Sequence, residues 1–349
     1  MLSRSKQLVG LDIGSSNVKA VELKLLGPNR YQLVGLGLET LPSDTIVDGA
    51  IISKLPVADA ISKIFKTQKI KNRRVATSIS GHSVIVKKIQ MPSQSAAELA
   101  ETIHWEAEQY IPFDINDVNL DYQIIRDIPG TGNMEVLLVA VKRDKITDQN
   151  SVISMAGKTP VVVDIDAFAL QNCYEVNYQP SPTITVALLD LGASTLNVNI
   201  VKGSEFLFAR DISVGGNNYT DFLQKELSLD YDEAEATKRR ASQGDTSDRV
   251  QKVLRSTTEM LTLEVQKTFD YFRATAASGD IDRILLGGGA CHTPGLAEYM
   301  TGKLQVQTEI LDSFRSIEIG PGFSKDYVQS ISPDMAVAVG LALRDANEK

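Results

Sequence analysis

Two short segments, far apart in the chain, share a pattern of aspartate, glycine and hydroxyl side chains. Leu11-Asp-Ile-Gly-Ser-Ser16 and Leu189-Asp-Leu-Gly-Ala-Ser194 both read Leu-Asp-apolar-Gly-small-Ser, and their aspartates stand 178 positions apart (190 minus 12). A glycine lets the amides of a turn approach an anion closely, and neighbouring hydroxyls donate to phosphate oxygens. A carboxylate beside them can hold water on Mg²⁺, which prefers oxygen ligands. Two such turns facing each other indicate a nucleotide cleft.

A plain β-hairpin turn is the alternative for each segment, and one copy alone would favour it. Two copies in equivalent contexts, each between apolar strands, favour the binding site. A third motif agrees, because Ile284-Leu-Leu-Gly-Gly-Gly289 is a strand that runs into a glycine triad, where backbone can lie against a nucleotide. Alone, the triad is equally well explained as a packing turn. The chain has no GxGxxG and no GxxxxGK[ST] motif, which argues against a dinucleotide-binding fold and excludes a P-loop.

The surrounding pattern predicts an α/β fold in two similar halves with a small insertion. Ser95 and Glu98 form a capping box that starts a helix inside the insertion. Thr293-Pro294 and Ser332-Pro333 each supply an N-cap and an N1 proline for a helix. The expected strands cover 7–25 (two, around the first turn), 31–38, 74–79, 84–89, 118–125, 135–141, 161–165, 183–201 (two, around the second turn) and 281–286. The expected helices cover 56–67, 96–111, 144–156, a segment after Gly215-Gly216, 230–240, 246–277 and 334–344.

Composition excludes several partners. The chain has 349 residues with 36 basic and 44 acidic side chains, a net charge of -8, which argues against a nucleic-acid binder. No stretch approaches 18 uncharged apolar residues, and the first ten residues contain no signal-peptide core. Two cysteines without CxxC spacing and three histidines without ligand spacing indicate reduced, structural side chains: Cys173, Cys291, His82, His104 and His292.

The motifs, in this order, resemble those of the actin, Hsp70 and sugar-kinase superfamily of ATP-binding proteins. The segments 12–19 and 190–197 look like its two phosphate motifs, and 287–289 like its adenosine motif. VDIDAFALQ (163–171) and MAVAVGLAL (335–343) resemble its two connecting helices. The resemblance implies an actin-like, ribonuclease H-like duplicated ATPase fold of two lobes. It implies the subdomains 1A (1–83 and 333–349), 1C (84–160), 2A (161–225 and 280–332) and 2B (226–279).

The inserted subdomain (84–160) indicates which branch of that superfamily the chain resembles. A strand-helix-hairpin-helix unit at this place resembles the division protein FtsA and the PilM family of type IV pilus assembly proteins. The chain is similar to the PilM family in its length, in Trp105 to Phe113 and in the DIDAFAL segment. An FtsA-like division protein and an ATP-dependent small-molecule kinase of the same superfamily are the alternatives.

The resemblance also implies a site. It implies ATP between the lobes, Lys19 against the phosphates, and Asp12 and Asp190 holding Mg²⁺ through water. Asp166 would orient the attacking water, although it is a shorter acid than the family's usual glutamate, and Asp164 is a rival; cleavage would therefore be weak at most. The implied nucleotide-binding residues are Asp12, Gly14, Ser15, Ser16, Lys19, Asp190, Gly192, Ser194, Thr195, Gly215, Gly216, Asn217, Glu235, Lys238, Gly287, Gly288 and Gly289.

PilM relatives are cytoplasmic scaffolds that bind the N-terminal cytoplasmic tail of PilN, an inner-membrane protein, between the first subdomain and the inserted one. The resemblance therefore implies PilN and other pilus assembly proteins as partners, and a membrane reached only through them. A peptide-binding groove has no sequence motif of its own, so the sequence does not identify the residues that would hold the tail. Glu235 and Lys238, one helical turn apart, are equally well explained as a solvated ion pair.

Overall fold

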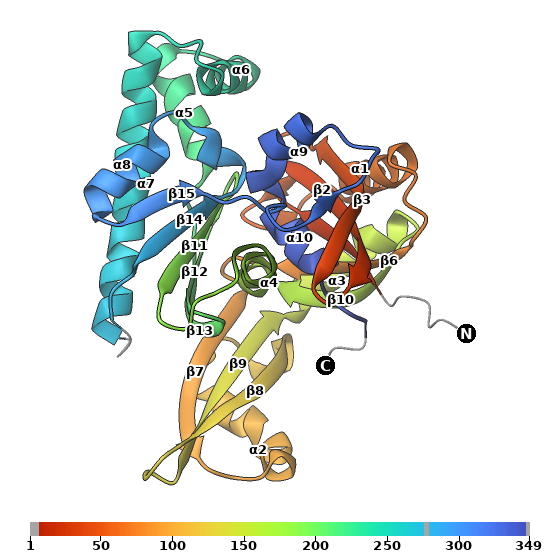
Figure 1. The fold of residues 1–349 in the computed structure, drawn as a ribbon, viewed down its shortest axis with the longest axis vertical. Helices are drawn as coiled ribbons and strands as arrows, with labels where there is room; N and C mark the ends of the chain where they lie inside the picture. The colour runs from red at the N-terminus through yellow and green to blue at the C-terminus, as the bar shows by residue number, and fades with distance from the viewer. Residues whose placement is uncertain (1–6, 276–278, 347–349) are drawn as a thin grey trace.

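The structure is a computed structural model that describes residues 7–275 and 279–346. Two lobes stand side by side, each built on its own sheet, and a small third sheet projects below them (Figure 1). Within the described residues, no helix is both long enough and apolar enough to cross a membrane.

The sheet of the first lobe has six strands in the order β10-β6-β1-β2-β3-β16. The antiparallel meander β1-β2-β3 is extended on one side by β6 and β10, which run parallel to β1. Helices α1 and α3 bury their apolar side chains against this sheet. The elements are β1 (Val9–Ile13), β2 (Asn17–Gly27), β3 (Arg30–Thr40), β6 (Arg74–Ile79), β10 (Thr159–Ile165), β16 (Glu318–Ile319), α1 (Lys54–Thr67) and α3 (Arg143–Met155).

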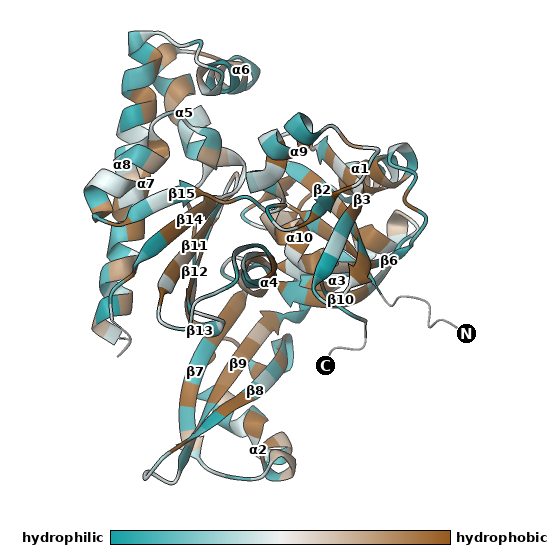
Figure 2. Ribbon diagram, in the orientation of Figure 1, coloured by the Kyte–Doolittle hydropathy of each residue, from teal (hydrophilic) through white to brown (hydrophobic). Residues whose placement is uncertain are grey.

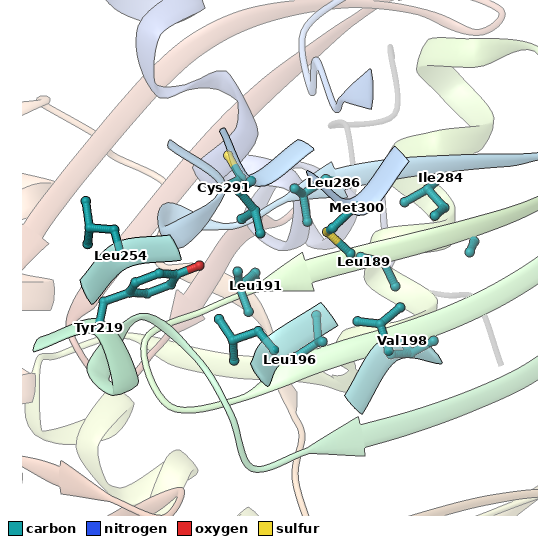
Figure 3. Packing of buried hydrophobic residues seen from close by; sticks show 14 of the residues in the cluster. Leu189, Leu191, Leu196, Val198, Tyr219, Leu254, Ile284, Leu286, Cys291 and Met300 are labelled. Atoms are coloured by element: carbon teal, nitrogen blue, oxygen red, sulfur yellow. The ribbon is translucent and has the colours of Figure 1, made fainter. Parts of the chain in front are cut away.

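The second lobe repeats this plan. Its sheet has the order β13-β12-β11-β14-β15, in which β11 pairs antiparallel with β12 and parallel with β14, as β1 does with β2 and β6. Figure 3 shows Leu191 and Leu196 of this sheet packed beside Tyr219 and Leu254 of the helices. The elements are β11 (Thr185–Leu191), β12 (Leu196–Lys202), β13 (Glu205–Ile212), β14 (Arg283–Gly287), β15 (Gln307–Ile310), α5 (Gly216–Leu227), α6 (Tyr231–Ser242), α7 (Asp248–Thr275) and α8 (Leu296–Leu304).

Two helices join the lobes, α4 (Asp166–Tyr178) and α10 (Ala336–Ala342). They lie between the two sheets (Figure 1), in a core cluster to which both lobes contribute. The crossing is so close that a Cβ on Gly340 would lie 1.7 Å from the Ala169 carbonyl oxygen. A glycine at position 340 is therefore required by backbone contact.

The inserted subdomain is a three-stranded antiparallel sheet, in the order β7-β9-β8, with α2 packed on one face. The capping box is confirmed, because the Glu98 amide donates to Ser95 Oγ and the Ser95 amide donates to the Glu98 carboxylate. In Figure 2, β9 is largely apolar, and its alternate residues Met134, Val136, Leu138 and Ala140 belong to the core cluster of the subdomain. The elements are β7 (Val84–Pro92), α2 (Ala96–Glu108), η1 (Ile115–Asp117), β8 (Val118–Ile128) and β9 (Asn133–Lys142).

Three elements pack or pair across the expected boundaries of the subdomains. Helix α3, expected in the insertion, buries Val152 and Ile153 in the core of the first lobe. Strands β10 and β16, expected in the second lobe, pair in parallel with β6 and β3 of the first sheet. Hydrophobic periodicity identifies an element but does not specify its partner, because the partner is distant in the sequence.

Two expected helix starts are wrong. Thr293 ends the short helix η2 (Gly289–His292), and α8 begins only at Leu296, after Gly295 in the left-handed region (φ 75°). Ser332 lies inside the 3-10 helix η3 (Ser332–Met335), which continues into α10. The local Thr-Pro and Ser-Pro patterns fit the start of an α-helix, but in both places a short 3-10 helix precedes the α-helix. The remaining elements, which the sequence did not predict, are β4 (Ile46–Val47), β5 (Ala50–Ile51) and α9 (Lys325–Ile331).

Candidate functional site

A cleft of about 770 Å³ opens between the two lobes. The turns β1-β2 and β11-β12 line it, together with the starts of α4 and α5 and one face of α6. Most of the residues expected from the sequence are brought together here: Asp12, Gly14, Ser15, Ser16, Lys19, Asp166, Asp190, Gly192, Ser194, Thr195, Gly216, Asn217, Glu235, Lys238 and Gly289.

The two Asp-Gly turns have the same geometry. The Gly14 amide donates to the Asn17 carbonyl at 3.0 Å, and the Gly192 amide donates to the Thr195 carbonyl at 3.0 Å. The turns face each other, since Ser15 Oγ and Ser194 Oγ share a hydrogen bond of 2.6 Å across the lobes. Two matched hydroxyl-bearing turns at this distance form a concave surface suited to phosphate oxygens.

Lys19 is the cation at the floor of the cleft. Its Nζ donates to Asp12 Oδ2 at 2.8 Å, because the two residues are register partners on β1 and β2. Burial alone would lower the pKa of Lys19, but the carboxylates of Asp12 and Asp190 outweigh burial and hold that pKa above its ordinary value. Lys19 therefore stays charged at neutral pH.

Asp190 lies beside Lys19 and Asp12 at the end of β11. Burial raises the pKa of Asp190 to about 7; the Lys19 ammonium opposes this shift, whereas the Asp12 carboxylate adds to it. A buried carboxyl group with this pKa lacks enough compensating positive charge. The oxygen-only donors of Asp12 and Asp190 thus fit Mg²⁺, which would supply that charge.

The pKa of Asp190 leads to a prediction about stability. Because this pKa is raised from 3.8 to about 7, the folded chain keeps a proton that the unfolded chain loses above about pH 4. The free energy of unfolding should therefore fall as the pH rises from about 4 to 7, by at most about 1.4 kcal/mol per pH unit from this group. Urea titrations at several pH values measure the slope. Asp190→Asn should make it shallower by up to that amount, and an unchanged slope would contradict the assignment.

Asp166, the expected water-orienting residue, is the first residue of α4 and faces the cleft. It accepts a hydrogen bond from Ser78 Oγ at 2.5 Å. Burial raises the pKa of Asp166 to about 7, the Asp12 carboxylate adds to the shift, and the Ser78 hydrogen bond opposes it. Its rival Asp164 does not line the cleft; its Oδ2 lies 3.4 Å from Arg344 Nε.

Helices α5 and α6 form the wall on the second lobe. The Gly216 and Asn217 amides donate to the Gly192 and Ala193 carbonyls at 2.9 and 2.8 Å, which ties α5 to the second turn. Lys238 Nζ donates to the Gly216 carbonyl at 3.1 Å and to Glu235. Burial lowers the pKa of Lys238, although Glu235 opposes this. The pair is thus part of the cleft wall and is not the solvated pair that was the alternative.

Three expected residues do not line the cleft. A Cβ on Gly215 would lie 2.5 Å from the Ala193 carbonyl oxygen, so Gly215 supports the second turn from behind. Gly287 and Gly288 pack against η3, and the Gly288 amide donates to the Pro333 carbonyl at 2.9 Å. Gly288 has a φ of 84°, and a Cβ there would lie 2.4 Å from the Leu191 carbonyl oxygen. Of the glycine triad, only Gly289 reaches the cleft.

Several residues that line the cleft were not expected from the sequence. Asn197 is one that the duplicated pattern points to, because Asn197 pairs with Asp190 as Lys19 pairs with Asp12. It donates to Asp211 Oδ1 at 2.8 Å. Arg239 and His292 also line the cleft but belong to no motif. A structural or surface role was expected for this histidine from its sequence spacing; its Nε2 lies 3.0 Å from Asp334 Oδ1, and Cys291 completes a group within 4.8 Å.

Two lobes of the same strand order, with paired Asp-Gly turns at the cleft between them, define an actin-like protein. Two solved structures have a similar fold. The ethanolamine utilization protein EutJ from Carboxydothermus hydrogenoformans superposes with a TM-score of 0.57 at 14 % identity, over 96 % of this chain and 89 % of that one. MreB5 of Spiroplasma citri bound to ADP superposes with a TM-score of 0.53 at 14 % identity, over 95 % of this chain and 94 % of that one. The expected fold class is confirmed.

Within that class the family is also shown. The model of the family described as type IV pilus assembly protein PilM matches residues 10–346, so the chain belongs to the PilM family. The solved structure "PilM-PilN type IV pilus biogenesis complex" superposes with a TM-score of 0.87 at 27 % identity, over 98 % of this chain and 99 % of that one. The expected membership of a pilus assembly family is confirmed.

Proposed function

We propose that this chain is an ATP-binding scaffold of the type IV pilus assembly machinery that binds the N-terminal cytoplasmic tail of PilN. The observation that carries the proposal is the likeness to a chain of the PilM-PilN complex, at 27 % identity over nearly the whole length of both chains. The inserted subdomain and the first lobe would hold the tail between them. The chain would then be cytoplasmic and would reach the inner membrane, and other pilus assembly proteins, through this partner.

ATP is the proposed ligand of the cleft. The two turns offer the hydroxyls of Ser15, Ser16, Ser194 and Thr195, and Lys19 offers a buried charge beside them. Asp12 and Asp190 would hold Mg²⁺ through water, and the ion would supply positive charge to the phosphates. Glu235 and Lys238 on α6, with Gly289 opposite, would contact the adenosine.

Cleavage of ATP should be slow compared with binding. Asp166 is the candidate that would orient water, but its side chain is one methylene shorter than the family's usual glutamate, and it is hydrogen-bonded to Ser78. A carboxylate that misses the in-line water by about 1 Å can lose on the order of 100-fold in rate. The cleft therefore suits a protein whose conformation depends on the bound nucleotide. This favours the scaffold over the small-molecule kinase.

Binding of a synthetic PilN tail peptide to the purified chain tests the proposal. Calorimetry should give one site per chain, with an affinity that depends on whether the cleft holds no nucleotide, ADP or a non-hydrolysable ATP analogue. Trp105 is the only tryptophan and is 75 % exposed on α2, so its fluorescence gives a second readout from the inserted subdomain. A scrambled peptide is the control. A peptide that fails to bind in every nucleotide state would contradict the scaffold, and phosphate release stimulated by a sugar or a carboxylic acid would favour the kinase.

A further inference from the structure

One edge of the first lobe carries a strong excess of positive charge, although the whole chain has a net charge of -8. The segment 60–97 contains eight Lys and Arg residues and no Asp or Glu. Five of these eight cations lie at the end of α1, in the loop after it and at the start of β6. We define the basic edge as the five exposed side chains there and one half-buried neighbour: Lys66, Lys69, Lys71, Arg73, Arg74 and Lys158.

Two segments distant in the sequence build the basic edge. The Thr159 amide donates to the Arg73 carbonyl at 2.8 Å, and Thr159 is the register partner of Arg74. Lys158 Nζ lies 4.0 Å from the centre of the Phe65 ring on α1. The 66–74 loop and the 155–159 turn therefore present their cations side by side, at the edge where β6 and β10 begin.

The positive charge of the basic edge has little compensation from the acidic side chains that the structure describes. Among the described residues, none of its six cations has an ion pair within 4.0 Å, whereas the neighbouring Lys63 pairs with Glu39 at 2.7 Å. Burial and the Arg73 guanidinium both lower the pKa of Lys158, so like charges repel each other here. One exposed acid, Asp345, lies near this edge through its bridge to Gln7. A polyanion that covered the edge would relieve this repulsion.

We propose that the basic edge binds the surface of an anionic phospholipid bilayer. Long, flexible lysine side chains match the mobile, distributed charges of such a surface, and each contributes about fivefold in affinity. Met155, 52 % exposed at the end of α3, adds an apolar side chain beside the cations. The large exposed aromatic side chains of the described residues, which single-stranded nucleic acid would need for stacking, lie on other elements: Trp105, Tyr231, Tyr271 and Tyr327. The choice of a bilayer rests on the proposed function, since a membrane-anchored partner would bring the chain to that surface.

Vesicle flotation with the full-length chain tests the proposal. The chain should bind vesicles with about 30 % phosphatidylglycerol at least tenfold more tightly than pure phosphatidylcholine vesicles, and salt should weaken this binding. The triple variant Lys69→Glu, Lys71→Glu, Arg73→Glu should lose at least tenfold in affinity for the anionic vesicles. Equal binding to both kinds of vesicle would overturn the proposal.

A matched control variant distinguishes the effect of charge at the basic edge from the effect of the net charge of the whole chain. Lys225→Glu, Lys252→Glu, Lys303→Glu changes three exposed lysines of the second lobe, without ion pairs in the described chain, and reaches the same net charge. It should bind the anionic vesicles within about twofold of the unmodified chain, because its changes lie outside the basic edge. The proposal is wrong if both triple variants bind alike, or if the chain binds a short DNA duplex more tightly than the vesicles at the same salt. The PilN tail peptide should bind both triple variants. Loss of peptide binding would count against the proposed scaffold function, whereas loss of vesicle binding alone concerns the basic edge.

Discussion

Gly340→Ala should destabilise the chain by more than about 3 kcal/mol or prevent it from folding. The added Cβ would lie 1.7 Å from the Ala169 carbonyl oxygen, a distance at which the backbones of α10 and α4 must separate. These two helices lie in the core between both lobes, so the shift cannot be absorbed locally. Urea unfolding monitored by circular dichroism measures the loss.

Gly302→Ala is the matched control, because Gly302 also lies inside a helix, α8, but has open space around its Cβ position. That change should stabilise the chain by up to about 1 kcal/mol through helix propensity alone. If the two variants had similar stabilities, the close crossing of α4 and α10 would be refuted.

Lys19→Ala should weaken ATP binding by about 100-fold, or close to 3 kcal/mol. Lys19 is the buried cation that pairs with Asp12 at 2.8 Å, and its charge also lowers the pKa of Asp190. Without it, two carboxylates would face the incoming phosphates with no fixed positive charge between them. Calorimetry with a non-hydrolysable ATP analogue and Mg²⁺ measures the change.

Lys24→Ala is the control for this variant, since Lys24 lies on the same strand, β2, but is exposed to solvent. It should leave the affinity for the nucleotide within about twofold of the unmodified chain. A Lys19→Ala chain that binds ATP as well as the Lys24→Ala chain would remove Lys19 from the proposed site. Thermal unfolding of both variants checks that any loss of binding is not a loss of fold.

Much of the site could be predicted because its chemistry is local. Asp12 and Gly14, like Asp190 and Gly192, are separated by one residue, so a strand end and a tight turn bring them together in any fold. The duplication then predicted that the two turns face each other, and the bond between Ser15 and Ser194 agrees with this. The same duplication pointed to Asn197, the last residue of the second phosphate-motif segment, which was missed because asparagine carries no charge.

The glycine triad shows where local reasoning was insufficient. A strand ending in three glycines fits both a nucleotide contact and a packing turn, and the structure uses it mostly for packing. Gly287 and Gly288 allow β14 to approach η3 and β11, and only Gly289 lines the cleft. The difference depends on Pro333 and Leu191, which are distant in the sequence and leave no trace in the motif itself.

Local patterns predicted the two turns and the capping box at Ser95, because each depends on residues a few positions apart. The duplicated strand pairs and the family followed from the order in which such patterns occur along the chain. The structure was needed to show that α3 and β10 pack in the first lobe, that α8 starts at Leu296, and which side chains meet across the cleft. It also brought the cations of 66–74 beside Lys158. All of these features depend on strand pairing, helix packing or charge interactions between residues that are distant in the sequence. Separation along the chain does not predict distance in space, so local patterns do not reveal such contacts.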